Sequence, residues 1–376
     1  MLRFNSDGKF VILQVSDTQD LHNPRRSMLK MLERAYDRVS PDLVIFTGDN
    51  ILGNHLRDMR FGNKKIIKTD EGEYRRMKKA LSYILDPVLA RNIPFTFIYG
   101  NHDDMNAFSK QEQNLIYRAY PNLVGLDNIY PDTEAGTFNV PISSCDGKRT
   151  AFNLWCFDSA RQTENGGLEA VTRDCLDWYK AESARLKKEN GGVPVPSLIF
   201  QHIPMKEQND LVEQCEPYSV GARAFGKFGF QRLTPELCRG TLGEPISAVK
   251  EDFGEADAIK ECGDVLAVVT GHDHTNQFDG RANGIRHIQT AAASFRCYGS
   301  RDRGVRVFVL DENKPESFET YTLSYSDLCG DGAAAHLNYI MDADGEQYKK
   351  AALLASFAIA GALVAAAGIK IVKRIK

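Results

Sequence analysis

Polar side chains with metal-binding atoms follow the ends of five apolar segments of this sequence. They are Asp17, Gln19, Asp49, Asn101, His102, His202, His272 and His274. Carboxylates, imidazoles and amides without a thiol suit Mn, Fe or Zn better than Cu(I) or an iron–sulfur cluster. Without His102 the set still offers seven ligands, too many for one tetrahedral ion but suitable for two divalent or trivalent ions that share a carboxylate. Two such ions can clamp both the attacking and the leaving oxygen of a phosphoryl displacement.

Three of these motifs begin with a glycine, which permits the sharp turn that directs a ligand. They are Gly48-Asp49-Asn50, Gly100-Asn101-His102-Asp103 and Gly271-His272-Asp273-His274. Taken alone, a strand-end aspartate is usually a turn former or helix cap, and a single buried histidine is usually structural. Two imidazoles two residues apart are rarer, and the joint pattern predicts a metal centre.

The apolar segments that must position these residues alternate with helices in the first hundred residues. Strands are predicted at 10–16, 42–47 and 94–99. Between them, apolar residues recur at helical spacing from Met28 to Val39 and from Tyr74 to Val88. Pro41 is expected to end the first helix, and Pro87 to disturb the end of the second. This order predicts a parallel α/β core, in which the carboxyl ends of the strands meet at one crevice.

The later sequence adds strands without an obvious repeat. Strands are expected at 151–157, 197–201, 265–270, 285–291 and 305–310, with a helix at 171–189. The glycine- and proline-rich stretch 221–245 is predicted to be irregular surface structure, and 324–350 a polar linker.

The order of the motifs resembles that of the calcineurin-like metallophosphoesterases over residues 9–323. Within them it is most similar to the purple-acid-phosphatase-related group that contains the yeast phosphatase Dcr2. Segment 200–204, Thr275-Asn276 after the last motif, and Tyr298-Gly299 support this grouping. The resemblance implies an α/β fold of four layers, a β-sandwich of two mixed sheets with helices outside.

The resemblance also implies a role for each site residue. Asp17, Gln19, Asp49 and His274 would hold the first ion; Asp49, Asn101, His202 and His272 would hold the second; and a hydroxide bridging the ions would attack phosphorus. His102 would act at the leaving oxygen as general acid or charge stabiliser, and Asp103 would orient it. The substrate would be a phosphorylated protein or small molecule.

Gln19 departs from the family pattern, in which histidine is common at this position. A glutamine oxygen is a weaker donor than imidazole, so either the first ion binds less tightly or Gln19 acts outside the coordination sphere. His22 is a candidate substitute, although an exposed loop position is the preferred explanation.

Three functions are compatible with these residues. A phosphomonoesterase accounts for the complete motif set. A phosphodiesterase or pyrophosphatase acting on a nucleotide or lipid head group would use the same chemistry, and the locally basic segment 55–68 could border its cleft. A membrane-tethered scaffold with a vestigial metal site is motivated by Gln19 alone.

Charge divides the chain into an acidic body and a basic, apolar tail. The net charge is −3, but the six basic residues after position 348 leave 41 basic and 50 acidic residues in the body. An acidic body argues against binding of long nucleic acid, which needs clustered Lys and Arg.

The uncharged run 351–369 predicts a transmembrane helix at 351–372 followed by a basic tail at 373–376. The predicted organisation is a catalytic domain at 1–323, the linker and this membrane anchor. The polar start of the chain does not resemble a secretory signal, so the catalytic domain is expected in the cytoplasm. The basic residues after the span favour the opposite orientation.

Overall fold

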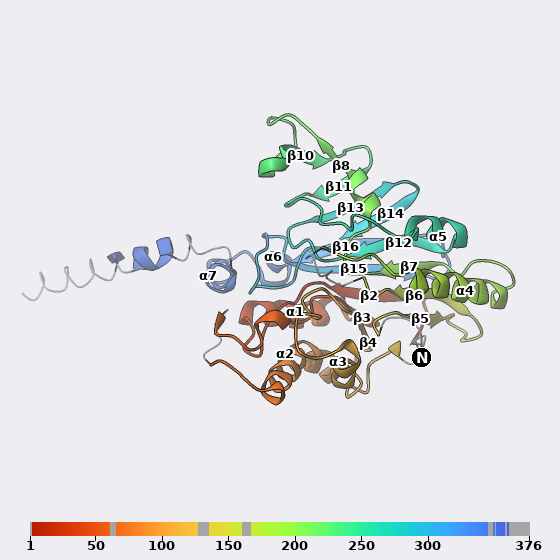
Figure 1. Ribbon diagram of the computed structural model, residues 1–376, viewed down its shortest axis with the longest axis horizontal. Helices are drawn as coiled ribbons and strands as arrows, with labels where there is room; N and C mark the ends of the chain where they lie inside the picture. The colour runs from red at the N-terminus through yellow and green to blue at the C-terminus, as the bar shows by residue number, and fades with distance from the viewer. Residues whose placement is uncertain are drawn as a thin grey trace, which may run out of the picture.

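Two mixed β-sheets pack face to face in the computed structural model, and helices cover their outer faces (Figure 1). The structure describes residues 2–60, 65–126, 135–159, 167–344, 349, 351–357 and 359–360. The five-stranded sheet has the order β16 (Phe318–Ser324), β15 (Gly304–Asp311), β2 (Lys9–Val15), β3 (Leu43–Thr47), β4 (Phe95–Ile98). The fold is the mixed α/β arrangement that the motif order implied.

The second sheet has eight strands and supplies the other half of the core. Its order is β1 (Leu2–Arg3), β5 (Phe138–Ser143), β6 (Thr150–Cys156), β7 (Ser197–Phe200), β12 (Val265–Thr270), β14 (Ile285–Gln289), β13 (Gln277–Ala282), β11 (Cys238–Thr241). Strands β6, β7, β12 and β14 run parallel. Strands β2, β3 and β4 are also parallel, with Ile12 opposite Leu43 and Val44 opposite Phe95, which confirms the predicted parallel core.

Helices connect and cover these strands. They are α1 (Arg26–Val39), α2 (Asp70–Ala90), α3 (Lys110–Tyr117), α4 (Arg173–Glu189) and α5 (Glu255–Cys262). Helix α1 ends where Ser40 adopts a left-handed conformation just before Pro41. Helix α2 begins at an N-cap, Thr69, whose side chain accepts a hydrogen bond from Gly72 N–H, and it continues through Pro87 to Ala90.

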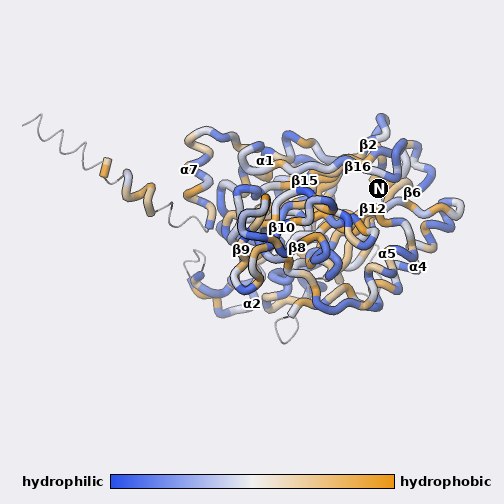
Figure 2. Tube along the Cα trace, turned by 90° about the horizontal axis from the view of Figure 1, so that it is seen from above, coloured by the Kyte–Doolittle hydropathy of each residue, from blue (hydrophilic) through white to orange (hydrophobic). Residues whose placement is uncertain are grey.

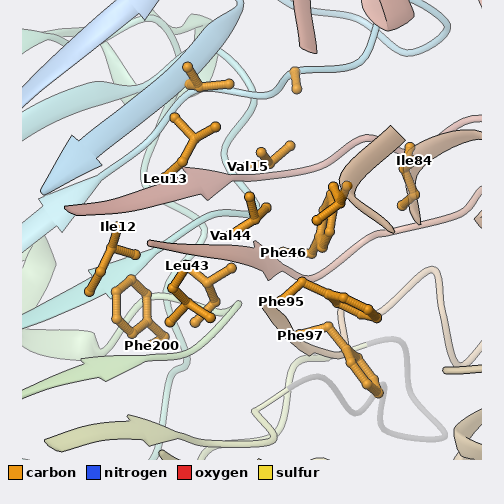
Figure 3. Close-up of a cluster of buried hydrophobic side chains, with 14 of the residues drawn as sticks. Ile12, Leu13, Val15, Leu43, Val44, Phe46, Ile84, Phe95, Phe97 and Phe200 are labelled. Atoms are coloured by element: carbon orange, nitrogen blue, oxygen red, sulfur yellow. The ribbon is translucent and has the colours of Figure 1, made fainter. Parts of the chain in front are cut away.

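Apolar side chains of the two sheets meet in the core between them. Figure 3 shows Ile12 and Leu43 of the five-stranded sheet beside Phe200 of β7. The Phe200 ring packs edge-on against Phe308 of β15, with centroids 5.8 Å apart. Alternation along each strand explains this arrangement, since every second side chain faces the same side of a sheet.

Two stretches differ from their predicted structure. Residues 221–245 are not wholly irregular: β9 (Arg223–Ala224) and β10 (Phe230–Leu233) pair with β8 (Val212–Gln214) in a small third sheet, and β11 joins the large one. Glycine and proline weaken strand propensity, but pairing with distant segments overrides it here.

The predicted linker is wrong for residues 324–344, which belong to the folded body. Helices α6 (Tyr325–Cys329) and α7 (Ala333–Asp342) pack against α1. Tyr325 and Tyr339 are buried, and Arg303 donates a hydrogen bond to the Tyr339 hydroxyl at 2.7 Å. The polar composition misled the prediction because these helices bury only a few large side chains.

The described part of the C-terminal segment is apolar and exposed. Leu354, Phe357 and Ile359 are 57–62% exposed, and Figure 2 shows hydrophobic stretches here. Within the described ranges, no helix has the length and apolar character needed to cross a membrane. Most of the predicted span (361–372) and the basic tail lie outside the described residues.

Candidate metal centre

The carboxyl ends of strands from both sheets meet at one place, where the predicted ligands gather. Backbone hydrogen bonds link the turns after β2 and β3: Asp17 N–H donates to the Gly48 carbonyl at 3.1 Å, and Gln19 N–H to the Asp49 carbonyl at 2.8 Å. The turns after β7 and β12 are linked in the same way, by Gly271 N–H and the His202 carbonyl at 3.2 Å. His272 N–H donates to Asp17 Oδ2 at 3.1 Å and joins the two sets of turns into one unit.

The backbone is strained at four of the predicted ligands. Asp17, Gln19, Asp49 and His272 have φ values of 50°, 31°, 48° and 73°, in the left-handed region that non-glycine residues rarely adopt. Each such residue costs about 1–3 kcal/mol and is typical of functional sites. These left-handed conformations direct the side chains from separate turns toward a common centre.

Close approach of the turns requires glycine at two positions. A Cβ atom on Gly100 would lie 2.1 Å from the Asp49 nitrogen, and one on Gly271 would lie 2.1 Å from the Ser16 hydroxyl oxygen. No side chain fits at either position without displacing a ligand-bearing turn. These glycines therefore allow the strand ends to converge.

Two groups of possible metal ligands share Asp49. One contains Asp49, His202 and His272, and the other contains Asp17, Asp49 and His274; within each group the donor atoms lie within 4.8 Å of one another. His202 Nε2 is 3.4 Å from Asp49 Oδ1, and His274 Nε2 is 3.5 Å from Asp17 Oδ1. Two groups with a common carboxylate have the composition needed to bind a pair of ions.

Buried oxygens without hydrogen-bond partners provide a test of whether metal ions fit. Among the described residues, Asp17 Oδ1, Gln19 Oε1 and Asn101 Oδ1 are buried and accept no hydrogen bond. Burying such an acceptor unpaired costs about 1–3 kcal/mol. Hard oxygen donors beside imidazole nitrogens suit Mn, Fe or Zn, so the residues present fit two ions.

Hydrogen bonds to the backbone orient two of the imidazoles. His202 Nδ1–H donates to the Thr47 carbonyl, and His274 Nδ1–H donates to the Tyr298 carbonyl, each at 2.9 Å. A carbonyl can only accept, so both Nδ1 atoms carry hydrogen. In the neutral rings Nε2 is then unprotonated and directed at the aspartates, as a metal ligand must be.

The charges of the centre favour ionised carboxylates. Burial opposes ionisation of Asp17 and Asp49, but His202 and its neighbouring histidines lower the pKa of both. Burial likewise lowers the pKa of His202, yet Asp49 and Asp17 outweigh it and raise this pKa to about 10. Burial lowers the pKa of His272 to about 3, so this ring is neutral near pH 7.

The described hydrogen bonds of Asp103, which the resemblance assigns to orienting His102, join it to the backbone of neighbouring turns. Its buried carboxylate accepts hydrogen bonds from the backbone N–H groups of Gly100, Asn50 and Ile51 at 2.8, 3.1 and 3.1 Å. The carboxylate is occupied by backbone donors and thus joins the turns after β3 and β4. Burial and the charge of Asp49 raise its pKa to about 8.

His22 and the basic segment 55–68 were minor alternatives in the sequence, and neither supplies a member of the two ligand groups among the described residues. His22 belongs to neither ligand group, and burial together with Arg76 and Lys79 lowers its pKa to about 4. In the described part of the basic segment, Arg57 forms ion pairs with Asp70 and Glu73. The charge of Arg57 is therefore balanced by these two carboxylates.

Two further residues beside the centre were not predicted as parts of it. The Tyr298 ring stacks on His274, with centroids 4.3 Å apart, and its hydroxyl donates to Glu244 at 2.8 Å. Glu244 also accepts from Thr275 N–H at 2.8 Å. Glu244 lies in the stretch predicted to be irregular, and no sequence pattern linked it to the last motif.

Known proteins are similar in sequence to most of this chain. The sequence model of the family described as calcineurin-like phosphoesterase matches residues 10–276. "Probable inactive purple acid phosphatase 29" of Arabidopsis thaliana is 27% identical over 350 residues, 83% of this chain and 79% of that protein. Phosphatase DCR2 of Saccharomyces cerevisiae is 23% identical over 355 residues, 83% of this chain and 53% of that protein.

Among solved structures, a dimetal phosphatase from Danio rerio is similar, with a TM-score of 0.47 and 14% identity. The alignment covers 84% of this chain and 99% of that one.

Proposed function

Because this chain belongs to the calcineurin-like phosphoesterase family, we propose that it hydrolyses a phosphate monoester at a two-metal centre. The observation that carries the proposal is the pair of ligand groups that share Asp49. The family consists of phosphoric ester hydrolases. The choice of a monoester as the substrate is our proposal. The substrate would be a phosphorylated protein or a small phosphate ester.

Each side chain has a role in this proposal. Asp17, Gln19, Asp49 and His274 would hold the first ion, and Asp49, Asn101, His202 and His272 would hold the second. When bound, the ions supply a hydroxide nucleophile near neutral pH and positive charge for the phosphoryl oxygens. We assign Mn, Fe or Zn to the centre from its oxygen and nitrogen donors.

His102 would protonate the leaving oxygen. Its backbone N–H donates to Asp49 Oδ1 at 2.8 Å, which fixes this residue beside the shared ligand. Transfer of its proton as the P–O bond breaks would avoid release of an unstable alkoxide, a contribution of typically 10²–10⁴-fold in rate. Asp103 would act indirectly, by holding the turn that carries His102.

The decisive experiment is hydrolysis of a chromogenic aryl phosphate with Mn²⁺, Fe²⁺ or Zn²⁺ added. We expect metal-dependent turnover that Asp49→Asn abolishes and His102→Gln lowers by about 10²–10⁴-fold. His336→Gln is the matched control, since His336 is exposed on α7 and should leave the rate unchanged. Absence of metal-dependent turnover would refute the proposal.

The same assay separates the alternatives. A higher rate on a bis-aryl than on a mono-aryl phosphate would replace the monoesterase by a diesterase. Fewer than one ion per chain in folded, inactive protein would favour the scaffold. The name of the Arabidopsis relative includes "inactive", so the activity of this chain has to be measured directly.

We further propose that residues 351–372 anchor the protein in a membrane, with the catalytic domain on the cytoplasmic side. The uncharged run and the exposed side chains of Leu354 and Phe357 support the anchor. The full chain should float with lipid vesicles, and a chain ending at residue 344 should not. Cleavage of the body by protease added outside intact cells would refute the orientation.

A further inference from the structure

The His102 ring is hydrogen-bonded by a side chain from outside the recognised motifs. His102 Nδ1 lies 3.3 Å from Asn54 Oδ1. An amide oxygen only accepts hydrogen bonds, so the hydrogen of this bond belongs to Nδ1. Asn54 lies in a single turn of 3-10 helix, η1 (Gly53–His55), that follows the Gly48-Asp49-Asn50 motif.

This turn packs tightly against the backbone of His102. A Cβ atom on Gly53 would lie 2.2 Å from the His102 carbonyl oxygen, so only glycine permits the contact. On one side of the turn, Asp103 binds the N–H groups of Asn50 and Ile51. On the other side, Leu56 is fully buried in the core. Asn54 is therefore presented to the His102 ring from an anchored segment.

The ring also lies near the predicted metal ligands. The backbone N–H of His102 donates to Asp49 Oδ1 at 2.8 Å, which places this residue beside the shared ligand. His102 is thus held between Asn54 and the centre, with Nδ1 engaged by the amide. Nε2 is the nitrogen that remains for a substrate.

We propose that Asn54 is a positioning residue that fixes the His102 ring so that Nε2 faces the leaving oxygen. The inference rests on the proposed phosphomonoesterase function and on the hydrogen-bond geometry. As the oxygen of a water molecule forms a bond to phosphorus, that water gives one proton to solvent. The bond to the leaving oxygen breaks, and the proton on Nε2 passes to that oxygen. The ring keeps its Nδ1 hydrogen bonded to Asn54, and Nε2 regains a proton from solvent.

Leaving-group dependence tests this role, because a poor leaving group needs the proton and a good one does not. In Asn54→Ala, kcat for an alkyl phosphate should fall about 10–100-fold, since misplacing a catalytic group by about 1 Å can cost 10²-fold. With dinitrophenyl phosphate, kcat should change little, and KM should stay constant for both substrates. Equal losses on both substrates, or none on either, would overturn the proposal.

A matched control perturbs the same loop without the His102 contact. Asp58 pairs with the His55 ring at 2.6 Å, four residues after Asn54. Asp58→Asn should leave the ratio of the two rates as in the unsubstituted protein. If it changes the ratio as Asn54→Ala does, the effect is loop disorder and the positioning role is rejected.

A measurement without turnover keeps this inference separate from the proposed function. In NMR spectra of the full chain with isotope-labelled histidine, His102 should carry its hydrogen on Nδ1 in the neutral form, with assignment by His102→Gln. Asn54→Ala should remove that preference. Inactive protein with the Nδ1 preference intact would refute the monoesterase, whereas active protein without it would refute the role of Asn54.

Discussion

Gln19 is the site residue that departs from the pattern implied by the family resemblance. Its amide nitrogen donates to Asp49 Oδ2 at 3.2 Å, and its oxygen is buried without a hydrogen-bond partner among the described residues. The donor half of the amide therefore orients the shared carboxylate. The acceptor half is left available to an ion, which favours direct coordination over an outer position.

We predict that Gln19→Ala weakens binding of one ion by about 10–100-fold and leaves the other nearly unchanged, a loss typical of groups that support a metal site. Gln19→His should bind that ion more tightly than the unsubstituted protein, since imidazole is the stronger donor. Competitive titration with a metal indicator, with elemental analysis, measures both effects. Loss of both ions together in Gln19→Ala would contradict independent ligand groups.

Asp103 shows how one side chain can hold two elements together. Its three backbone hydrogen bonds connect the turn after β3 with the turn after β4, and its side chain is almost completely buried. Removal of the carboxylate would leave three buried N–H groups without acceptors. Replacing Asp103 should therefore disturb the arrangement of the turns after β3 and β4.

Asp103→Ala should lower the free energy of unfolding of the metal-free protein by about 2–4 kcal/mol, because each unsatisfied buried group costs about 1–3 kcal/mol and relaxation recovers part of that. Denaturant unfolding in the presence of chelator measures it without a contribution from bound metal. Asp331→Asn, at an exposed site before α7, is the control and should have no effect. An unchanged stability in Asp103→Ala would mean that water replaces the carboxylate.

Strand β14 contains a buried histidine that should make stability sensitive to acid. His287 is fully buried, and burial lowers its pKa from 6.5 to about 4. The unfolded chain therefore binds a proton near pH 6.5, whereas the folded protein does so only near pH 4. Protons therefore favour the unfolded state between these values. The contribution of neutral His287 to the free energy of unfolding is complete above pH 6.5 and is lost as the pH falls toward 4.

Replacing His287 by Gln should flatten this acid dependence. In the unsubstituted protein, His287 should lower the free energy of unfolding by about 3 kcal/mol between pH 6.5 and 4, at about 1.4 kcal/mol for each unit between the two pKa values. The variant should not show this loss. Denaturant unfolding at several pH values measures the slope, with His336→Gln as the exposed-histidine control. A slope equal to that of the unsubstituted protein would show that other groups dominate.

At the scale of the whole molecule, the centre joins the two sheets. Asp17 and Asp49 follow strands of the five-stranded sheet, whereas His202 and His272 follow strands of the eight-stranded sheet. Ions bound between them would link elements far apart in sequence. Binding to the folded state alone stabilises it by about 2.7 kcal/mol when free metal is 100-fold above Kd.

Chelation should therefore lower the melting temperature of the full chain by several degrees, and added Mn²⁺ or Zn²⁺ should restore it. Asp49→Asn should melt at the same temperature with and without chelator. Calorimetry or a thermal fluorescence scan measures both. An equal shift in this variant would show that the metal acts elsewhere on the protein.

Short-range patterns in the sequence were sufficient to predict the parallel core and the convergence of several ligands. Strand and helix periods predicted the parallel core, because alternating apolar side chains and strand ends are properties of short segments. Asp17, Asp49, His202, His272 and His274 were predicted to converge for the same reason, since parallel strands end at one edge.

Only the tertiary structure decided which side chains support these residues. Asn54 lies 48 positions from His102, and Asp103 lies 53 positions from Asn50. Such partners depend on how distant turns pack, and an asparagine in a loop has no distinguishing local pattern. The hydrogen bond between Arg303 and Tyr339 could not be predicted either. Tyr339 is one of only a few buried side chains in a segment of polar composition.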